Sequence, residues 1–259
     1  MTLTPTRTPT RRERLREATV AEIKQAARAT LATDGPAGLS LRAIARAMGL
    51  SAPALYRYFP SRDDLVAALC ADLYDELAGA LRTARDAADR RPPAGATTGG
   101  ARPTAEAPAA EAPAAAGRLL AAARAFRAWA VAHPAEFALM FASPVPYPDS
   151  HAGSPHHEAG MRFAEVFLAP FVELWVHRPF PVPAVPPALA GQLEEFGGML
   201  GLALPLGAVA VFLDCWVRLY GSVTLEVFGQ LHFCLTDAEP LFEATLADLA
   251  ARLGLPAGS

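Results

Sequence analysis

The stretch Ser40–Leu65, SLRAIARAMGLSAPALYRYFPSRDDL, constrains the fold more than any other part of the chain. Apolar residues recur at three- and four-residue spacing after Ser40, which suits a helix N-cap, and Gly49 ends that pattern. Ser51 can cap a second, very short helix directly afterwards. Two helices joined by so tight a turn predict a helix-turn-helix over about residues 40–59.

Tyr56, Arg57 and Tyr58 are consecutive in the second of these helices and cannot all face inward from so short an element. Leu55 and Phe59 are better candidates for the core. In a helix-turn-helix the second helix enters the major groove of DNA, where tyrosine can reach a phosphate and arginine a phosphate or a base edge. The alternatives are that the two tyrosines pack between helices and that Arg57 is only solvated.

Positive charge gathers at the start of the chain. Residues 1–62 hold 11 of the 23 Lys and Arg residues but only 4 of the 26 Asp and Glu residues, a balance of +7 in a chain of net charge −3. The remainder therefore carries −10. This asymmetry indicates a basic module for a polyanion attached to an acidic body, although a solvated charged helix face gives the same pattern.

Helical periodicity continues along the chain and no stretch alternates like a strand, so the predicted fold class is all-α. Ser61 can cap a helix with leucines at four-residue spacing from Leu65 to Leu81. Residues 1–13 are expected to form a flexible arm, and the Pro/Ala/Gly/Thr tract over residues 90–113 a disordered linker, because it offers nothing bulky to bury. Further helices are expected at about residues 114–133, 134–142, 155–177, 187–203, 206–231 and 237–253.

The sequence gives little support to a membrane or exported protein. The N-terminus has arginines but no apolar core behind them, so no signal peptide is expected. The uncharged stretch Phe196–Leu213 is just long enough to span a bilayer, but Pro205 divides it. We expect two buried helical pieces there and no membrane partner.

Catalysis and metal binding also find little support. No Gly-rich phosphate loop and no G-x-S-x-G motif is present, and the apolar neighbours of the cysteines should raise their pKa, so no enzyme is expected. The histidine-rich stretch lacks helical ligand spacing, so neither a metal nor a cofactor is expected. The cysteines are Cys70, Cys215 and Cys234, which are expected to be buried reduced thiols of a cytoplasmic protein. The residues considered as metal ligands are His151, His156, His157 and Glu158.

The segment LSLRAIARAMGLSAPALYRYFPSRDDL resembles the signature of the TetR family of bacterial transcriptional regulators, over roughly residues 14–77. The resemblance implies a three-helix DNA-binding domain whose recognition-helix tip leaves only apolar base readout to Ala52. Arg62 stands where lysine is usual, which keeps the charge at a phosphate-contact position. With Arg57 added, the predicted DNA-binding residues are Ser40, Arg42, Ser51, Ala52, Pro53, Tyr56, Arg57, Tyr58 and Arg62.

The second half resembles the C-terminal domain of a TetR subgroup with a Trp-His-Gly signature, on the segments His133–Phe141 and Cys215–Gly221. Tyr220 stands where that subgroup usually has histidine. The resemblance implies a small-molecule pocket and a homodimer built from the last long helices, within a larger helical domain over residues 114–255. Aromatic residues can line such a pocket or form ordinary core; the candidates are Trp129, Phe137, Met140, Phe141, Phe163, Phe167, Phe171, Trp175, Phe196 and Trp216.

These observations together predict a cytoplasmic, nucleoid-associated, homodimeric transcriptional regulator. It is expected to bind a palindromic operator in double-stranded DNA and to respond to a small apolar effector. A repressor that the effector releases from its operator is the leading hypothesis. An activator of the same fold, an interaction module without a ligand and an enzyme domain tethered to DNA are the alternatives.

Overall fold

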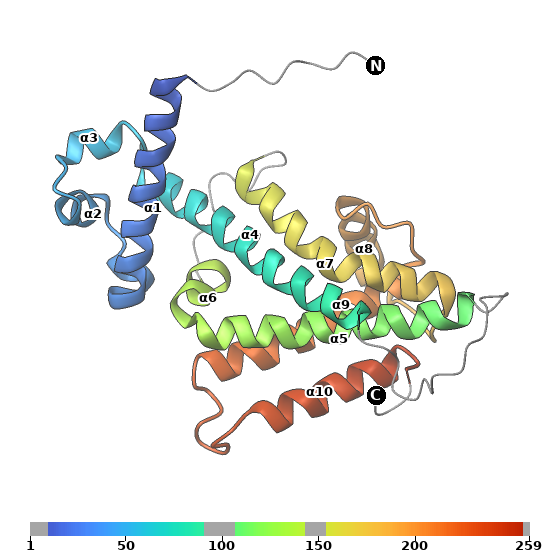
Figure 1. Ribbon diagram of the computed structural model, residues 1–259. Helices are drawn as coiled ribbons and strands as arrows, with labels where there is room; N and C mark the ends of the chain where they lie inside the picture. The colour runs from blue at the N-terminus through green and yellow to red at the C-terminus, as the bar shows by residue number, and fades with distance from the viewer. Residues whose placement is uncertain (1–9, 91–106, 143–153, 256–259) are drawn as a thin grey trace, which may run out of the picture. The chain divides into compact units, whose positions relative to one another are not determined.

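The structure, a computed structural model, describes residues 10–90, 107–142 and 154–255. Most of these residues are helical, and no strand occurs among them, so the all-α prediction is confirmed (Figure 1). The helices are α1 Arg11–Gly38, α2 Leu41–Ala47, α3 Ala52–Tyr56, α4 Arg62–Asp89, α5 Ala107–Ala132, α6 Pro134–Phe141, α7 Pro155–His177, α8 Pro187–Met199, α9 Leu206–Val227 and α10 Glu239–Arg252.

The chain divides into two compact units. The N-terminal unit comprises Met1–Leu73 and Ala135–Ala159, and the C-terminal unit comprises Tyr74–Pro134 and Gly160–Ser259. Helix α4 begins in the first unit and continues as one helix into the second. The helix-turn-helix and the larger helical domain are thus distinct bodies joined by α4.

Helix α6 belongs to the N-terminal unit, although the sequence assigns it to the effector domain. Its residue Glu136 is buried, and the Nε atom of Arg28 on α1 donates a hydrogen bond to Glu136 Oε1 (3.1 Å). A buried carboxylate needs such a partner, because an unpaired buried charge is strongly destabilising. This long-range pair joins α6 to the helices of the first unit.

Local sequence signals account for the turn between α2 and α3. The Oγ atom of Ser40 accepts a hydrogen bond from the Ala43 N–H (3.2 Å), which confirms Ser40 as the N-cap of α2. Gly49 has a φ of 67°, and the N–H groups of Gly49 and Leu50 donate to carbonyls of the last turn of α2. This is a Schellman arrangement, which favours glycine at the left-handed position. Ser51 precedes α3 as predicted, but its side chain makes no capping hydrogen bond.

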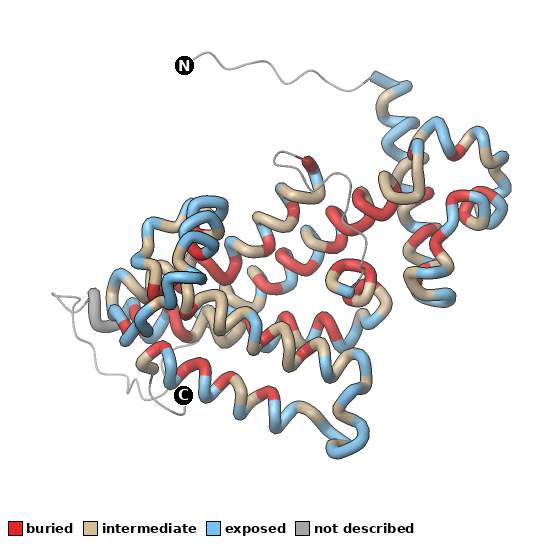
Figure 2. Tube along the Cα trace, turned by 180° about the vertical axis from the view of Figure 1, so that it is seen from behind, coloured by how far each residue is buried: buried red, intermediate tan, exposed pale blue. Residues whose placement is uncertain are grey.

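The start of α4 is held by a reciprocal cap. The Oγ atom of Ser61 accepts a hydrogen bond from the Asp64 N–H (3.1 Å), and Asp64 Oδ2 accepts one from the Ser61 N–H (2.8 Å). The leucines at four-residue spacing from Leu65 to Leu81 are all buried, as predicted. Figure 2 shows how buried and exposed positions alternate in this way along the helices.

Helix α5 begins earlier than the sequence predicts. The predicted linker extends to Pro113, but α5 starts at Ala107 and contains that proline in its second turn. Alanine is the best helix former, and Ala112 and Ala115 are small enough to pack in the core of the C-terminal unit. The linker prediction is therefore wrong for residues 107–113, and residues 91–106 lie outside the described part of the chain.

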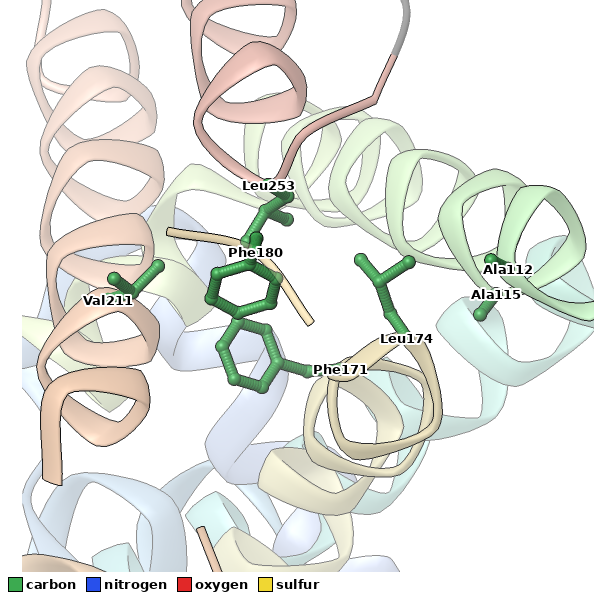
Figure 3. Packing of buried hydrophobic residues seen from close by; sticks show 7 residues of the cluster. All are labelled: Ala112, Ala115, Phe171, Leu174, Phe180, Val211 and Leu253. Carbon is green, nitrogen blue, oxygen red and sulfur yellow. The ribbon is translucent and has the colours of Figure 1, made fainter. Parts of the chain in front are cut away.

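Helix α9 is central to the C-terminal unit, where it packs against α5, α8 and α10. Beside it, Phe171 of α7 and Phe180 stack edge to face, 5.4 Å between ring centroids, and Figure 3 shows Leu253 at the end of α10 next to Phe180. Gly207 lies in the first turn of α9, where the segment before α8 passes closely. A Cβ at this position would lie 2.8 Å from the Cβ of Val182, so only glycine fits without a shift.

The uncharged stretch Phe196–Leu213 is interrupted as predicted, because α8 ends at Met199 and α9 begins at Leu206 with Pro205 as its N-cap. By length and composition, α9 is the one helix within the described residues that could cross a membrane. Only 28% of its most apolar stretch is buried within one copy. The prediction of two buried pieces therefore fails for the outer side of α9.

The three cysteines differ in burial. Cys70 is buried, Cys215 is partly buried and Cys234 is exposed, and all three are free thiols. The prediction of a buried thiol is wrong for Cys234. It follows α9 in a turn whose apolar residue Phe233 is exposed as well, because connections between helices run over the surface.

Candidate DNA-binding surface and effector cavity

Helix α3 turns one side to the core and the other to solvent. Leu55 is fully buried and Phe59 is buried as well, as predicted. Tyr56 is 43% exposed, and Arg57 is exposed beside it. The alternative that Tyr56 only packs between helices does not fit this exposure.

The other candidate contacts of the turn also reach the surface. Ser40, Arg42, Ser51 and Pro53 are exposed, and Ala52 is half-buried. Each is therefore available to a molecule outside the chain. The structure brings these residues, together with Tyr56 and Arg57, into two adjacent short helices and the turn between them.

Arg62 has structural partners that the sequence does not reveal. Its Nε atom donates to the Leu39 carbonyl (2.9 Å) and its Nη2 atom donates to the Pro36 carbonyl (2.9 Å). Both carbonyls lie at the end of α1, so Arg62 ties the start of α4 to that end. Its Nη1 atom lies 3.7 Å from Asp63 Oδ1. A phosphate contact by Arg62 stays a prediction, and it would have to share a guanidinium already engaged by the protein.

A hollow of about 480 Å³ lies in the N-terminal unit between the start of α1 and the residues that follow α3. Tyr58 is half-buried at one wall, and the guanidinium Cζ of Arg16 lies 5.2 Å from the centre of its ring. This distance corresponds to a cation–π contact. Arg16 is not among the predicted contact residues; the excess of arginine in residues 1–62 is the sequence signal that could have pointed to it. The hollow is lined by Thr10, Arg12, Glu13, Leu15, Arg16, Thr19, Arg57 and Tyr58.

A smaller cavity of about 70 Å³ lies within the C-terminal unit and is bounded by α5, α7, α9 and α10. Three of the ten predicted pocket residues line it: Phe167, Phe171 and Trp216. The rest of the wall is supplied by residues that are not among those predicted, chiefly leucines of α5 and α10. The only side-chain atoms in the wall that are not carbon belong to Cys215 and Trp216.

Two family models match the chain. The model described as "Bacterial regulatory proteins, tetR family" matches residues 23–69, which include the helix-turn-helix. The model described as "Tetracyclin repressor-like, C-terminal domain" matches residues 119–249, half of the chain. The chain belongs to the TetR family.

Relatives and solved structures agree with this assignment. HTH-type transcriptional regulators of Mycobacterium tuberculosis and Mycobacterium bovis are each 32% identical over 248 residues, 94% of this chain and 95% of theirs. The crystal structure of regulatory protein SCO4313 is 32% identical, has a TM-score of 0.65, and the match covers 94% of this chain and 100% of that one. A Rhodococcus sp. RHA1 protein of unknown function shares the fold, with a TM-score of 0.59 at 22% identity over 91% of this chain and 94% of its own.

As a TetR-family member, the protein is a DNA-binding transcriptional regulator and not an enzyme. The surroundings of Cys215 agree with this. Burial, with a smaller contribution from the neighbouring Asp214, raises the pKa of the Cys215 thiol to about 11. A thiol that stays protonated at neutral pH is a poor nucleophile.

Seven of the predicted pocket residues of this TetR-family chain lie outside the cavity. Trp129 donates a hydrogen bond from Nε1 to Glu76 Oε1 (3.3 Å), and Trp175 packs edge to face against Phe180 (4.9 Å between centroids). Because burial depends on packing between distant segments, aromatic content alone could not separate cavity wall from core. The others are Phe163 in an aromatic cluster with Phe126 and Trp216, Phe137, Met140 and Phe141 in the N-terminal unit, and Phe196, half-buried on α8.

Tyr220, at the histidine position of the Trp-His-Gly subgroup, stacks almost parallel on Trp216 (5.8 Å, 16°). Trp216 lines the cavity, so Tyr220 packs against a residue of the cavity wall without lining the cavity itself. Of the histidines considered as metal ligands, His151 lies outside the described residues. Within the described residues no group of three His, Cys, Asp or Glu side chains could hold a metal ion. Burial lowers the pKa of His156.

Proposed function

We propose that this TetR-family regulator is a homodimeric repressor that a small apolar ligand releases from a palindromic operator. The observation that carries the proposal is the pair of surfaces described above: a basic, solvent-facing α2–α3 surface in one unit and an apolar cavity in the other. A protein of this kind works in the cytoplasm, where the chromosome lies.

The α2–α3 surface suits a DNA groove. The exposed Tyr56 can donate its hydroxyl hydrogen to a phosphate, and Arg42 and Arg57 can bind a phosphate or a base edge. Neither arginine forms an ion pair with a carboxylate of the described residues, so both are available to a polyanion. Binding should weaken steeply with salt, because each phosphate that is neutralised releases counterions.

The outer side of α9 is suited to a second copy of the chain. Leu213 and Val217 of α9 and its C-cap residue Phe228 recur at helical spacing and form an apolar stripe with Leu225 at its edge. The charged residues Asp214 and Arg218 flank this stripe and form ion pairs with Arg252 and Asp248. Val217 is 58% exposed and Leu225 is 41% exposed in one copy. Continuous exposed apolar surface usually marks a protein interface. A two-fold pairing of this stripe would place two helix-turn-helix elements on one operator.

The cavity suits an apolar ligand that must enlarge it. Its volume of about 70 Å³ is roughly half of a cavity known to hold benzene, which has ~150 Å³. A larger ligand would therefore push apart the helices that line the cavity. To change operator occupancy from nearly full to nearly empty, it must favour the DNA-free state by about 5.5 kcal/mol. At ~25 cal/mol per Å², that corresponds to roughly 220 Å² of extra apolar burial.

The experiment is a screen of small molecules for release of a fluorescent duplex selected by the wild-type protein from a random-sequence pool. Apolar compounds should release it and polar metabolites or chelators should not. Phe212→Ala alters the cavity wall and should shift the effective concentration at least about tenfold, on the scale of 1.4 kcal/mol. Phe196→Ala, a half-buried phenylalanine of α8 outside the cavity, is the matched control and should leave it unchanged. Equal responses of both variants would refute the cavity assignment.

A further inference from the structure

The hollow between α1 and the end of α3 is lined by three arginines and one carboxylate, that of Glu13. Arg12 and Arg16 of α1 line it, and so does Arg57, the C-cap residue of α3. All three side chains are exposed, and none forms an ion pair with a carboxylate of the described residues. By contrast, Arg28 on the same helix is paired with Glu136. Three guanidinium groups against the one carboxylate of Glu13 give the hollow an excess of positive charge, which a bound anion would offset.

The orientation of Arg16 is set by the protein and not left to solvent. Its guanidinium lies over the ring of Tyr58, which is half-buried and therefore a fixed platform. A cation on an aromatic face keeps its N–H groups free at the edge of the guanidinium plane. Arg16 can thus donate hydrogen bonds into the hollow with little further loss of side-chain freedom.

The anion would be held by these side chains and not by the helix end. Thr10 and Glu13 form a reciprocal cap at the start of α1: the Glu13 N–H donates to Thr10 Oγ1 (3.2 Å), and the Thr10 N–H donates to Glu13 Oε2 (2.6 Å). Thr19, also in the wall, donates its hydroxyl hydrogen to the Leu15 carbonyl (3.0 Å). The free donors of the hollow are therefore the arginines and the hydroxyl of Tyr58.

We infer that this hollow binds a phosphodiester of the operator backbone beside the groove that α3 enters, with Arg16 as the contact and Tyr58 as its platform. The inference rests on the proposed function. The proposed site extends the protein–DNA contact from the helix-turn-helix to the first turns of α1. The ligand is a DNA phosphodiester and not a free phosphate, because the hollow is wide, shares Arg57 and Tyr58 with the α2–α3 surface, and has no buried donor that would enclose a separate anion.

The test compares Arg16→Ala with Arg14→Ala, which removes an exposed arginine of the same helix that does not line the hollow. Affinity for the selected duplex and for an unrelated duplex is measured by fluorescence anisotropy over a range of salt concentrations. A dimer loses two phosphate contacts in Arg16→Ala, so the slope of log K against log[salt] should become shallower by about 1.8. Affinity should fall about tenfold for both duplexes alike, because a phosphate contact carries no sequence information. Arg14→Ala should change the salt slope and the affinity by less than half of the changes seen in Arg16→Ala.

Two substitutions at Tyr58 distinguish its contact with Arg16 from a role in folding. Tyr58→Phe keeps the aromatic face and should retain the wild-type salt slope, whereas Tyr58→Leu should reproduce the loss seen in Arg16→Ala. Thermal denaturation of each variant checks that the fold is intact. A wild-type slope in a folded Arg16→Ala protein, or equal effects of the Arg14 and Arg16 substitutions, would overturn the inference.

Failure of the inference is distinguishable from failure of the proposed function. If the wild-type protein binds no duplex, the proposed function itself is wrong. If it binds DNA and Arg16→Ala alters only the binding of inorganic phosphate, measured by calorimetry, the hollow takes a free anion and the assignment to the DNA backbone falls.

Discussion

Arginine has different surroundings in the two units: in the C-terminal unit it mostly lies against carboxylates, and in the N-terminal unit it mostly lacks them. Arg127 of α5 donates hydrogen bonds to Glu226 of α9 (2.7 Å) and Glu239 (3.0 Å), and the bonds with Glu226 raise the pKa of Arg127. Ion pairs of this kind are also formed by Arg118, Arg124, Arg162, Arg218 and Arg252. The arginines that pair with no carboxylate of the described residues include Arg11, Arg12, Arg14, Arg16, Arg42, Arg46 and Arg57.

This difference separates arginines that join helices from arginines, such as Arg16, Arg42 and Arg57, that are expected to bind a partner outside the chain. A guanidinium between two helices contributes little if exposed and more where it is partly buried, as Arg127 is. An unpaired cluster adds repulsion to the folded protein and gains its favourable interaction only when a polyanion binds. The same residue type therefore stabilises the bundle in one unit and is expected to bind DNA in the other.

The basic surface is expected to bind an operator tightly only in a dimer, in which two copies contact the same duplex. Val217→Asp places a charge in the apolar stripe of α9 and should give a monomer, because a buried carboxylate without a partner opposes association. A monomer reads one half-site, so affinity for the selected duplex should fall by about 4 kcal/mol, the lower end of the gap between specific and non-specific binding. Sedimentation and anisotropy measure the two effects. Val176→Asp, an exposed valine of α7 outside the stripe, is the control and should remain a DNA-binding dimer.

Arg127→Ala tests the structural role of arginine in the C-terminal unit. It leaves the half-buried Glu226 and the more exposed Glu239 without their partner, and we expect a loss of about 3 kcal/mol in the free energy of unfolding. Urea denaturation measures it, with Arg178→Ala, an exposed arginine that is unpaired within the described residues, as the control. DNA affinity of the folded variant should hold. Weaker DNA binding by Arg127→Ala with an unchanged free energy of unfolding would show that Arg127 contributes to DNA binding and not to the stability of the fold.

Arg42→Ala combined with Arg57→Ala tests the opposite role in the N-terminal unit. DNA affinity should fall by about 2 kcal/mol, the scale of charge-assisted hydrogen bonds, while the melting temperature stays within about 2 °C of wild type because exposed substitutions rarely alter stability. Anisotropy and thermal denaturation give the two values. A lower melting temperature with unchanged DNA affinity would show that Arg42 and Arg57 stabilise the fold and do not bind DNA.

Tyr56→Phe tests how much a single hydroxyl group of the N-terminal unit contributes to DNA binding. The ring packing is retained and only the proposed phosphate contact is lost, so binding to every sequence should weaken by about 1 kcal/mol. Thermal stability should be nearly unchanged, because Tyr56 is 43% exposed. A drop in melting temperature without loss of affinity would show that Tyr56 acts in packing.

The smallest effect at neutral pH is expected at the cavity. The folded-state pKa of Cys215 is raised from its usual 9.0 to about 11, so the stability associated with its neutral thiol is present below pH 9 and is lost as pH rises through 11. Iodoacetamide at pH 8 should modify the exposed Cys234 and spare Cys215 and Cys70 in the folded protein. Mass spectrometry of the labelled peptides checks this, and rapid labelling of Cys215 would show that the cavity wall is open.

Much of the fold follows from patterns within a few residues. Ser40 and Ser61 cap their helices as predicted, since the groups that they satisfy lie three residues away. The leucines of α4 and the inward Leu55 and Phe59 follow from helical spacing. The start of α5 was not predictable in this way, because alanine favours a helix and proline opposes it, and the outcome depends on burial of Ala112 by distant segments.

The sequence by itself determined the helix-turn-helix, the exposure of Tyr56 and the charge difference between the two parts of the chain. Each depends on local spacing or on composition, which folding does not rearrange. Only the tertiary structure decided that Arg62 bonds to the end of α1, that Arg16 lies on Tyr58, and that leucines of α10 close the cavity. These contacts join residues 23 or more positions apart, and the partner of a side chain at such a distance is chosen by the packing of whole helices.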